Sequence, residues 1–391
     1  MGENLTKLKN ALVSHSDWLS GDPGQVGKLT GILGQVAGGN GVVLGGDHPP
    51  LPGKILIATG GTTGSPRFAI HTWDTLCAAA ECLVRKLGPG ISSYSILPME
   101  HVSGFLPVVR AVVSGGKLVL GSKNTLPDEP EGLCISLVPT QLVRFLADKK
   151  EVKKLREARM VFLGGAAADH QLLHKACAYG VPLAPCYGMT ETGAMVTMLD
   201  PEDFLSGLVG CGQALPGVDI SIAGDGQVYV DTPGLCEGYA GGDGEVSRPF
   251  ATNDMGEIDA SGCLQILGRM DRVIITGGEK VDPIEVENAL RKIPTVRECL
   301  VVGTEDPEWG HRVTAFVTGC CDDELGLIHA LRSGLPSYKI PKRIYVVGNL
   351  PYDNKGKVDW ERIKALTRDR VHAPGLAPVR VQGDSDPPGG G

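Results

Sequence analysis

Residues Ile55-Leu-Ile-Ala-Thr59-Gly60-Gly61-Thr62-Thr63-Gly64-Ser65-Pro66-Arg67 decide the fold of this chain. The apolar run Ile55–Ala58 predicts a buried strand, and a loop of glycines and hydroxyl residues follows it directly. Glycine permits close approach of the backbone to a ligand, and successive N–H groups with Thr and Ser hydroxyls can cradle phosphate oxygens. Arg67 adds a cation at the end of the loop. Taken alone, such a loop is more often a plain turn than a phosphate site, so the remaining contacts of a nucleotide must come from elsewhere in the chain.

The composition argues against a nucleic-acid-binding or membrane protein. The chain has 391 residues, of which 42% are hydrophobic, and this length favours two domains. A formal net charge of -8 leaves no excess of Lys and Arg to neutralise a nucleic acid. The 11 cysteines include no Cys-x-x-Cys pair, so we expect reduced thiols, no zinc site and a cytoplasmic location. We expect neither a signal peptide at the polar stretch Met1–Lys9 nor a membrane span, because no run of about 18 apolar residues occurs.

Strands and helices are predicted to alternate from Lys54 to about Pro185. The strand candidates are Ile55–Ala58, Ser93–Leu97, Lys117–Leu120, Cys134–Val138, Met160–Leu163 and Pro182–Pro185. The helical patterns between them are Thr72–Leu87, Gly104–Ser114, Thr140–Lys149 and Asp169–Tyr179. This alternation favours an α/β domain with a largely parallel sheet, in which ligands lie beyond the carboxyl ends of the strands. Residues 1–50 predict one helix, at about Leu5–Leu19, followed by a Gly-rich connection.

The sequence pattern changes twice after this domain. Between about Leu208 and Leu267, short alternating runs separated by Gly and Asp predict a β-rich subdomain. The stretch Asp282–Glu285 then predicts the start of a helix, with Asp as N-cap and Pro at the first position, inside a small α+β domain. We expect an N-terminal domain over residues 1–270, a C-terminal domain over residues 271–370 and a disordered Pro/Gly-rich tail over residues 371–391.

Several loops that follow predicted strands carry side chains suited to a nucleotide, and each has a plain structural alternative. His101 lies at a strand-to-helix turn, where a structural His is about as common as a ligand-binding one. The small residues of Gly164–Ala168 would let a flat ring lie against the backbone, or form only a tight turn. In Tyr187–Thr192, Tyr187 could flank a base, Thr190 could bind a phosphate oxygen and Glu191 could hold Mg²⁺. The alternative for this stretch is a loop with a helix N-cap at Thr190.

Two further stretches complete the set of candidates. Asp254 in Thr252–Asp254 suits two neighbouring ribose hydroxyls, and Arg269 could add hydrogen bonds and charge. Lys357 in Asn354–Lys357 lies on a Gly-hinged loop from which a cation could reach an anionic centre. The alternative for Lys357 is a basic turn on the surface.

In order and spacing, these stretches resemble the adenylate-forming superfamily of acyl-CoA synthetases, peptide-synthetase adenylation domains and luciferases. The resemblance runs from about Lys54 to Asp359 and rests on the motifs Thr-Gly-Gly-Thr-Thr-Gly-Ser-Pro-Arg, Tyr-Gly-Met-Thr-Glu, Thr-Asn-Asp, Gly-Arg-Met-Asp and Gly-Lys. It implies an ATP- and Mg²⁺-dependent enzyme that makes an acyl-adenylate from a carboxylate and then transfers the acyl group to coenzyme A. The implied fold is a large N-terminal α/β domain with mostly parallel sheets and a β-rich subdomain, followed by a small α+β lid domain.

The same resemblance assigns roles by position. The implied cofactor-binding residues are Thr59, Thr62, Thr63, Gly64, Ser65, Arg67, Gly165, Ala166, Tyr187, Gly188, Asp254 and Arg269. The implied catalytic residues are Lys357, Thr190, Glu191 and His101, and Glu191 is also the implied Mg²⁺ ligand. A cation such as Lys357 would stabilise the charge that accumulates when a carboxylate attacks the α-phosphate. Asp271 matches the hinge about which the small domain is expected to turn between the two half-reactions.

Within the superfamily, the chain is most similar to the o-succinylbenzoate–CoA ligase family of menaquinone and phylloquinone synthesis. This similarity rests on Leu97–Gly104, Ser136–Leu142, Phe162–Ala167 and Trp309–Arg312. Arg110 lies nine positions after His101, where that family has an arginine. We hypothesise that Arg110 attracts the second carboxylate of the substrate, directly or through water, and the alternative is an Arg on a helix surface. Thr140 and Gly188 are the other implied substrate contacts.

The chain departs from the family pattern in two places. Arg67 replaces the usual Lys, which keeps the charge but not the shape. The region before the phosphate loop is shorter than in typical relatives, so we expect part of the usual N-terminal subdomain to be absent. The expected partners are the carboxylate, ATP and CoA, and a homo-oligomer stays open. The alternative functions are a ligase or adenylation enzyme for another carboxylic acid and a catalytically inactive nucleotide-binding regulator.

Overall fold

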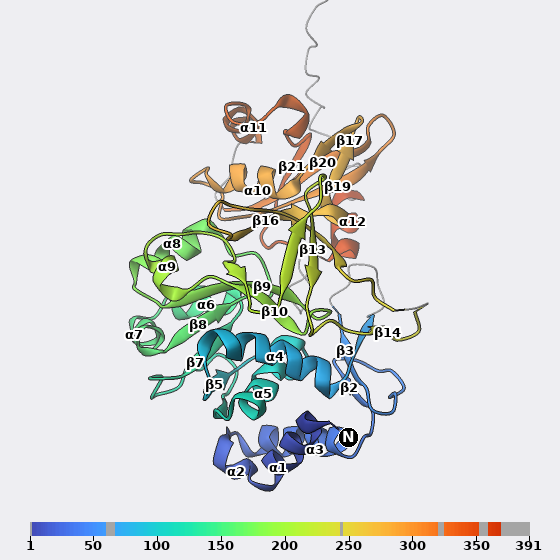
Figure 1. Cartoon of the computed structure of the whole chain (residues 1–391). Coiled ribbons are helices and arrows are strands. Elements are labelled where there is room, and N and C mark those ends of the chain that lie inside the picture. Colours follow the sequence, from blue (N-terminus) through green and yellow to red (C-terminus); the bar gives the residue numbers. More distant parts are fainter. Residues whose placement is uncertain (1, 60–66, 243–244, 320–323, 352–358, 369–391) are drawn as a thin grey trace, which may run out of the picture. The chain divides into compact units, whose positions relative to one another are not determined.

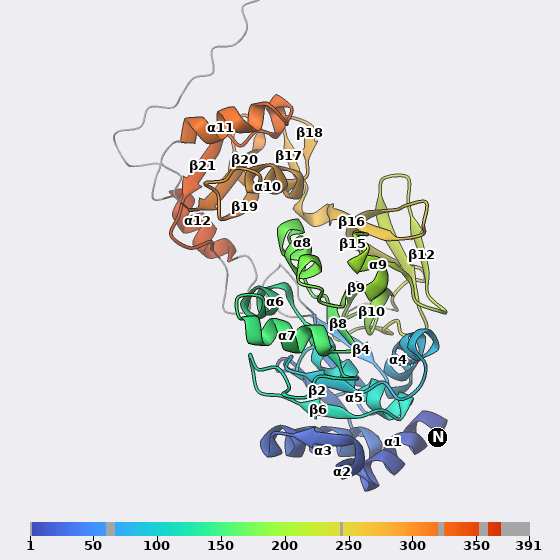
Figure 2. The ribbon, with the colours of Figure 1, turned by 90° about the vertical axis from the view of Figure 1, so that its left-hand side faces the viewer.

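The computed structural model describes residues 2–59, 67–242, 245–319, 324–351 and 359–368 (Figures 1 and 2). They form two compact units that divide between Val273 and Ile274. The first unit contains an eight-stranded sheet and two four-stranded sheets, and the second contains one five-stranded sheet. The cysteines in these ranges form no disulfide. Among the described helices, none combines the length and the apolar character that crossing a bilayer requires.

The eight-stranded sheet organises the first unit. Its strand order is β1 (Leu19–Gly21), β6 (Leu118–Leu120), β5 (Ser93–Ser95), β7 (Cys134–Leu137), β8 (Met160–Leu163), β9 (Leu183–Met189), β10 (Ala194–Met198) and β11 (Gln213–Ala214). The pairs from β1 to β9 are parallel, and β10 and β11 are added antiparallel. The predicted largely parallel sheet is therefore confirmed.

Both faces of this sheet are covered, which explains why its central strand β8 is a continuous apolar run. All four residues of β8 are buried, and they alternate between two cores. Val161 and Leu163 pack with helices α6 (Pro139–Phe145), α7 (Lys149–Glu157), α8 (His170–Ala178) and α9 (Pro201–Leu205). Met160 and Phe162 pack on the other face, with helix α4 (Trp73–Leu87) and the β-rich sheet.

The opening stretch lies in a different sheet from the one that we predicted. β3 (Ile55–Ala58) belongs to a four-stranded sheet with the order β14 (Gly238–Tyr239), β4 (Phe68–His71), β3 and β2 (Val42–Leu44). β3 pairs antiparallel with β4, and the backbone N–H of Thr59 donates to the carbonyl of Arg67 at 2.7 Å. The expectation that this strand joins the large parallel sheet is wrong. β3 pairs in parallel with β2, and it pairs antiparallel with β4 because the connection between β3 and β4 is too short for a parallel crossover. The phosphate-loop candidate therefore connects the two strands of a hairpin.

The β-rich subdomain is confirmed as a four-stranded antiparallel sheet. Its order is β12 (Asp219–Ile222), β13 (Gln227–Asp231), β15 (Phe250–Ile258) and β16 (Leu264–Arg269). In the β15–β16 pair, Asp254 lies opposite Arg269. The backbone register alone therefore brings these candidate residues together.

The N-terminal segment contains more regular structure than we expected. The predicted helix is divided into α1 (Glu3–Val13) and α2 (His15–Trp18), and a third helix, α3 (Pro23–Ala37), occupies the region expected to be a Gly-rich connection. Glycine lowers helix propensity by roughly 1 kcal/mol per residue, which obscured the apolar period of Leu29, Leu33 and Val36 on the buried face. α1 is tied to α4, because the indole N–H of Trp73 donates to the carbonyl of Asn4 at 3.1 Å.

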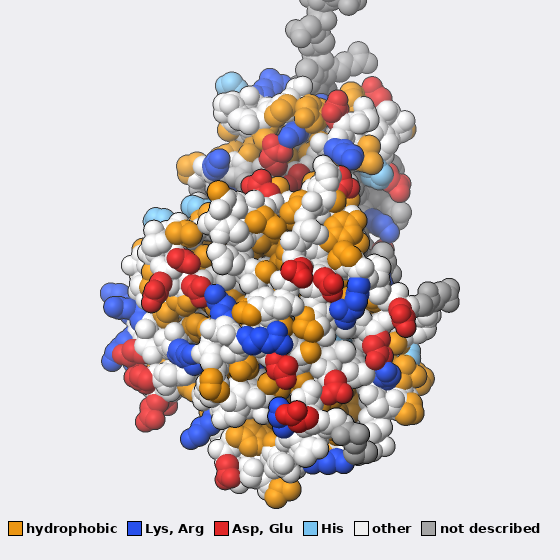
Figure 3. All heavy atoms as spheres, viewed as in Figure 1, with side chains coloured by type: hydrophobic (Ala, Val, Ile, Leu, Met, Phe, Trp, Pro, Cys, Tyr) orange, Lys and Arg blue, Asp and Glu red, His pale blue; other side chains and the backbone are white. Residues whose placement is uncertain are grey.

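The other helices of the first unit agree with the predicted pattern except at one place. α4, α5 (Val102–Ser114) and α8 lie where we expected them. The single helix predicted over Thr140–Lys149 is wrong. That region holds α6 and the start of α7, because the side chain of Asp148 caps α7 by accepting from the backbone N–H of Lys150. On the face of this unit shown in Figure 3, acidic and basic side chains are interspersed.

The second unit is the predicted α+β arrangement. Its strands are β17 (Ile274–Thr276), β18 (Glu279–Val281), β19 (Glu298–Asp306), β20 (Gly310–Thr318) and β21 (Arg343–Val346). Its α-helices are α10 (Pro283–Arg291), α11 (Glu324–Arg332) and α12 (Trp360–Arg368). Asp282 caps α10 as expected by accepting from the backbone N–H of Ile284. The short 3₁₀ helices are η1 (Met270–Arg272), at the end of the first unit, and η2 (Ser337–Lys339), in the second unit.

Candidate active site

Loops from neighbouring parallel strands meet at one edge of the eight-stranded sheet. β5, β7, β8 and β9 are consecutive in the sheet, so their carboxyl ends point to the same edge. His101 follows β5 as the N-cap of α5, and Thr140 follows β7 in the first turn of α6. Gly165 and Ala166 follow β8 and are exposed, and Gly165 has a φ of 81° that glycine adopts without strain. The structure brings these candidates to one edge, and their contacts with a ligand stay predictions.

The hairpin of β9 and β10 carries the next group of candidates. Tyr187 and Gly188 lie inside β9 rather than in a loop, and Gly188 pairs with Met195 of β10. A Cβ atom at position 188 would lie 2.0 Å from the carbonyl oxygen of Ala194, so only glycine fits here. The alternative of a helix N-cap at Thr190 is wrong, because the chain turns directly from β9 into β10.

Tyr187, Asp254 and Arg269 form what we call the ribose-side cluster. The hydroxyl of Tyr187 donates to Oδ2 of Asp254 at 2.7 Å, and Nη1 of Arg269 lies 3.4 Å from Oδ1. Burial raises the pKa of Asp254, while Tyr187 and Arg269 act against this shift. A carboxylate has about four lone-pair positions, so Asp254 can still accept hydrogen bonds from two neighbouring hydroxyls.

The predicted hinge residue is bonded to this cluster. Arg269 donates from Nε and Nη2 to the two carboxylate oxygens of Asp271 at 2.8 and 2.7 Å. This two-point hydrogen bond lowers the pKa of Asp271. The planar guanidinium of Arg269 is therefore held in one orientation beside Asp254, and the role of Asp271 as a hinge stays a prediction.

Arg67, Tyr239 and Glu191 form what we call the phosphate-side cluster. The guanidinium carbon of Arg67 lies 3.7 Å from the centre of the Tyr239 ring, and the hydroxyl of Tyr239 donates to Oε1 of Glu191 at 2.9 Å. The backbone carbonyl of Glu191 is also fixed, because it accepts from the N–H of Cys236 at 2.8 Å. Burial and the neighbouring Glu191 raise the pKa of Tyr239, so its hydroxyl keeps its proton. Sequence analysis did not identify Tyr239.

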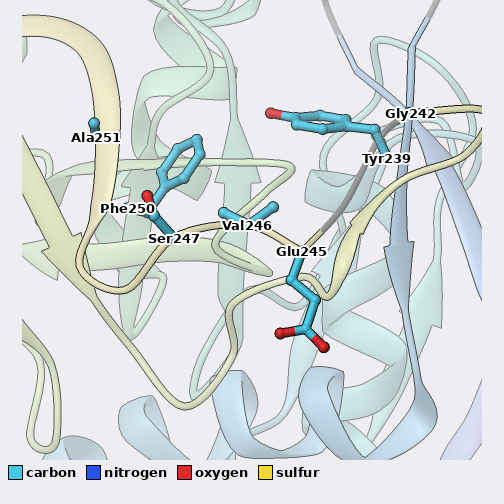
Figure 4. Close-up of a pocket in the computed structure, with 7 residues that line it drawn as sticks. All are labelled: Tyr239, Gly242, Glu245, Val246, Ser247, Phe250 and Ala251. Atoms are coloured by element: carbon cyan, nitrogen blue, oxygen red, sulfur yellow. The ribbon is translucent and has the colours of Figure 1, made fainter.

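A small pocket adjoins this cluster (Figure 4). It is lined by Tyr239, Gly242, Glu245, Val246, Ser247, Phe250 and Ala251. Figure 4 shows the carboxylate of Glu245 directed away from the rings of Tyr239 and Phe250. Tyr239 is therefore a wall of this pocket as well as the partner of Glu191.

His71 is a second residue that sequence analysis missed. It is fully buried at the end of β4, and its Nε2 lies 2.8 Å from the carbonyl oxygen of Thr190. Burial lowers its pKa to about 4, so the ring is neutral at pH 7, and Nε2 carries the proton because a carbonyl only accepts. His71 therefore anchors the turn that presents Thr190 and Glu191. A His within the apolar run Phe68–His71 was the available signal.

Arg110 is buried in α5, and the alternative of a surface arginine is wrong. Its side chain lies 4.9 Å from the centre of the Phe162 ring, and the residue is 3% exposed. Within the described ranges, Nε and Nη1 are buried without a hydrogen-bond partner. Burial lowers the pKa of this guanidinium. An unpaired buried cation is costly, so an anion that paired with Arg110 would remove part of that cost.

The remaining candidates flank the phosphate-loop candidate or lie outside the described residues. Thr62, Thr63, Gly64, Ser65 and Lys357 lie outside the described residues. Thr59 and Arg67 mark the two ends of the phosphate-loop candidate, directly after β3 and directly before β4. Within the described ranges, no group of three or more His, Cys, Asp or Glu side chains is arranged to hold a metal ion. A magnesium ion bound by one carboxylate and by phosphate oxygens needs no such group.

Comparison with known proteins relates this arrangement to one family. Residues 54–240 match the AMP-binding enzyme family, and residues 285–357 match the AMP-binding enzyme C-terminal domain. A 2-succinylbenzoate–CoA ligase of Lactococcus lactis is 31% identical over 339 residues, covering 83% of this chain and 73% of the relative. A probable 2-succinylbenzoate–CoA ligase of Mycobacterium tuberculosis is 32% identical, covering 78% and 82%.

Solved structures show the same relationship. The o-succinylbenzoate CoA synthetase of Bacillus subtilis, in complex with its acyl-adenylate intermediate, has a TM-score of 0.68 and 28% identity, covering 79% of this chain and 68% of its own. The same enzyme in complex with ATP and a magnesium ion has a TM-score of 0.67 and 27% identity, covering 79% and 69%. The chain therefore belongs to the family of AMP-binding, adenylate-forming enzymes, and it resembles the 2-succinylbenzoate–CoA ligases among them.

Proposed function

We propose that this chain is an AMP-forming acid–thiol ligase that converts o-succinylbenzoate, ATP and CoA into o-succinylbenzoyl-CoA through an acyl-adenylate. The observation that supports this substrate is the buried guanidinium of Arg110, with Nε and Nη1 unpaired in the described part of the chain. A monocarboxylic acid would leave this cation unpaired, whereas o-succinylbenzoate has a second carboxylate. The names of the relatives point to the same acid.

The reaction has two steps. First, a carboxylate oxygen of the acid attacks the α-phosphorus of ATP, the bond to the bridging oxygen of the β-phosphate breaks, and pyrophosphate leaves with that electron pair. Then the sulfur of CoA, having lost its proton, attacks the acyl carbon, and AMP leaves from that carbon. The product is a thioester, and AMP and pyrophosphate are the by-products.

The ribose-side cluster orients the nucleotide in this proposal. Asp254 would accept from the ribose hydroxyls, and its own position is fixed by Tyr187 and Arg269. Holding the nucleotide fixed keeps the α-phosphorus in line with the attacking carboxylate. Gly165 and Ala166, exposed after β8, would lie against the adenine.

The phosphate-side cluster would bind the part of ATP that leaves. Arg67 forms no ion pair with a described residue, so its N–H groups can face the pyrophosphate. The Glu191 carboxylate fits a Mg²⁺ ligand, because Tyr239 occupies Oε1 and leaves Oε2 as a hard oxygen donor. When bound, Mg²⁺ would neutralise part of the phosphate charge.

The release of pyrophosphate from ATP, measured with each of a panel of carboxylic acids, tests the function. We expect release with o-succinylbenzoate, and AMP and thioester formation once CoA is added. Release with a fatty acid or an amino acid instead would favour a ligase or adenylation enzyme for another acid. If none of the acids supports pyrophosphate release, the inactive nucleotide-binding regulator is favoured.

Replacing Arg110 with Leu tests the specificity. Because a charge-assisted hydrogen bond contributes about 1.5–3 kcal/mol, we expect KM for o-succinylbenzoate to rise roughly 10- to 100-fold. KM for ATP should stay the same, and so should any activity with benzoate, which lacks the second carboxylate. Arg144→Leu is the matched control, since Arg144 is exposed on α6 and its guanidinium donates to Asn124 on the surface. An unchanged KM for o-succinylbenzoate in Arg110→Leu would contradict the assignment.

Lys357 stays a prediction that separates the two half-reactions. Removing one group that stabilises transition-state charge typically costs about 10²- to 10³-fold in rate. We expect Lys357→Ala to lose adenylation by this factor while largely keeping thioester formation from supplied acyl-adenylate. An equal loss in both half-reactions would contradict the role of Lys357.

A further inference from the structure

Tyr239 connects two candidate ligand-binding groups that are far apart in the sequence. Its ring face holds the guanidinium of Arg67 at 3.7 Å, and its hydroxyl donates to the Glu191 carboxylate at 2.9 Å. Arg67 ends the phosphate-loop candidate, while Glu191 lies in the turn between β9 and β10.

The position of Tyr239 is set by the backbone. In the β14–β4 pair, Tyr239 lies opposite Ala69, two residues after Arg67. The backbone N–H of Ala240 also donates to the carbonyl of Phe68 at 2.9 Å, and that of Cys236 donates to the carbonyl of Glu191. The segment Cys236–Ala240 is therefore bonded at one end to the Glu191 turn and at the other to the strand that follows Arg67.

We propose that Tyr239 is a positioning residue that fixes Arg67 and Glu191 relative to one another, so that the pyrophosphate group of ATP and its Mg²⁺ are bound as one unit. The ring sets the orientation of the cation, and the hydroxyl sets which carboxylate oxygen remains for the metal. This inference rests on the proposed function, because it uses the assignment of Arg67 to phosphate and of Glu191 to Mg²⁺.

The proposal explains why arginine suits position 67. A planar guanidinium can stack on an aromatic face while its edge donates hydrogen bonds, whereas a lysine ammonium has no face to stack. The cation–π contact is worth about 0.5–1 kcal/mol at an exposed site, which corresponds to roughly 2- to 5-fold in binding. Arg67 and Tyr239 are thus a matched pair, and replacing either residue should remove the same interaction.

The test is a double-mutant cycle read out by ATP binding. Wild type, Arg67→Lys, Tyr239→Leu and the double variant are titrated calorimetrically with ATP, with and without Mg²⁺. We expect Arg67→Lys to weaken MgATP binding roughly 2- to 5-fold in the wild-type background and not further in Tyr239→Leu. Independent, multiplicative effects of the two replacements would overturn the proposal.

Tyr239→Phe isolates the hydroxyl. It keeps the ring and removes the bond to Glu191, so we expect binding of ATP with Mg²⁺ to weaken roughly 10-fold and binding without Mg²⁺ to stay the same. KM for MgATP should rise by a similar factor, with a smaller change in kcat. Equal losses with and without Mg²⁺ would contradict an action through Glu191.

Tyr229→Phe is the matched control, since the hydroxyl of Tyr229 donates to Gln227 within the β-rich sheet. We expect Tyr229→Phe to bind MgATP like wild type. Melting curves of all variants show whether a variant that binds ATP more weakly is still folded. If the folded wild-type protein neither binds ATP nor releases pyrophosphate, the proposed function itself is wrong. If wild type is active and Tyr239→Phe and Tyr239→Leu behave like Tyr229→Phe, only the role of Tyr239 is wrong.

Discussion

The ribose-side and phosphate-side clusters hold their charged groups by different means. On the ribose side, Asp254 and Arg269 face each other across two paired strands, so the sheet register fixes them. On the phosphate side, Arg67 and Glu191 lie at the ends of hairpins and are related through one tyrosine side chain. We infer that the ribose side tolerates the loss of a neighbouring side chain better, because its geometry is backbone geometry.

This difference fits the chemistry proposed for each side. The ribose does not change during the reaction, so a rigid acceptor suits it. The pyrophosphate forms, separates from AMP and leaves, so a binding group with a side-chain partner that can rearrange suits it. The predictions below test the comparison from the largest expected effect to the smallest.

Asp254→Ala should have the largest effect and should act on the ribose side alone. It removes a charged acceptor that would receive hydrogen bonds from two hydroxyls, so we expect ATP and AMP to bind roughly 100-fold more weakly, about 3 kcal/mol. Pyrophosphate binding should not change. Asp219→Ala, an exposed position on the same sheet, is the control. Calorimetry with the three ligands checks this, and a loss confined to pyrophosphate would reverse the comparison.

His71, which anchors the turn that carries Glu191, should make the stability of the fold depend on pH. Its pKa is about 4 in the folded protein against 6.5 in the unfolded chain, so the unfolded chain binds the extra proton between these values. The contribution of the neutral His71 ring to the free energy of unfolding is fully present above pH 6.5, and it decreases as the pH falls toward 4. The loss should reach roughly 2 kcal/mol at pH 5.

Urea unfolding at pH 7.5 and pH 5 measures this loss. His71→Gln keeps an N–H donor for the carbonyl of Thr190 and does not titrate, so its stability should change less between the two pH values. His174→Gln, at an exposed position on α8, is the control and should behave like wild type. An identical pH dependence in His71→Gln and wild type would show that the His71 ring does not carry the effect.

Glu191→Gln should act on the phosphate side through the metal. An amide oxygen is a weaker Mg²⁺ ligand than a carboxylate. We expect the Mg²⁺ concentration needed for half-maximal ATP binding to rise roughly tenfold, about 1.4 kcal/mol. AMP binding, which uses the ribose side, should be unaffected. If AMP binding falls as much as MgATP binding, the two clusters do not act separately.

Arg110→Leu should have the smallest effect, and it should raise rather than lower the free energy of unfolding. Replacing a buried, unpaired cation with an apolar side chain removes a desolvation penalty, so we expect the ligand-free protein to gain about 1 kcal/mol. Thermal melting without substrate measures the gain, with Arg144→Leu as the exposed control. A loss of stability would mean that Arg110 is paired in the free protein.

The elements that sequence analysis located are those with a strong local signal. β8 and the caps of α10 are recognisable because an apolar run or an Asp-Pro pair determines them over a few residues. Asp254 and Arg269 could be named for the same reason, since they lie in short motifs of one hairpin.

What sequence analysis missed depends on long-range contacts or on opposing local signals. Tyr239 and His71 were missed because their partners lie 48 and 119 positions away. β3 was placed in the wrong sheet, because an apolar strand looks the same in either one. The glycines of α3 concealed a helix that is stabilised by packing rather than by propensity.

The contact between Trp73 and α1 makes tryptophan fluorescence a probe of the N-terminal end of this protein. Trp73 is 5% exposed, and its indole is bonded to the carbonyl of Asn4. Undocking of α1 would expose the ring and the N–H to water together, and the emission of this fluorophore would move to longer wavelength. Because the chain has four tryptophans, a variant that keeps Trp73 and has Phe at the other three positions would report whether the first helix is docked, without an added label and without any substrate.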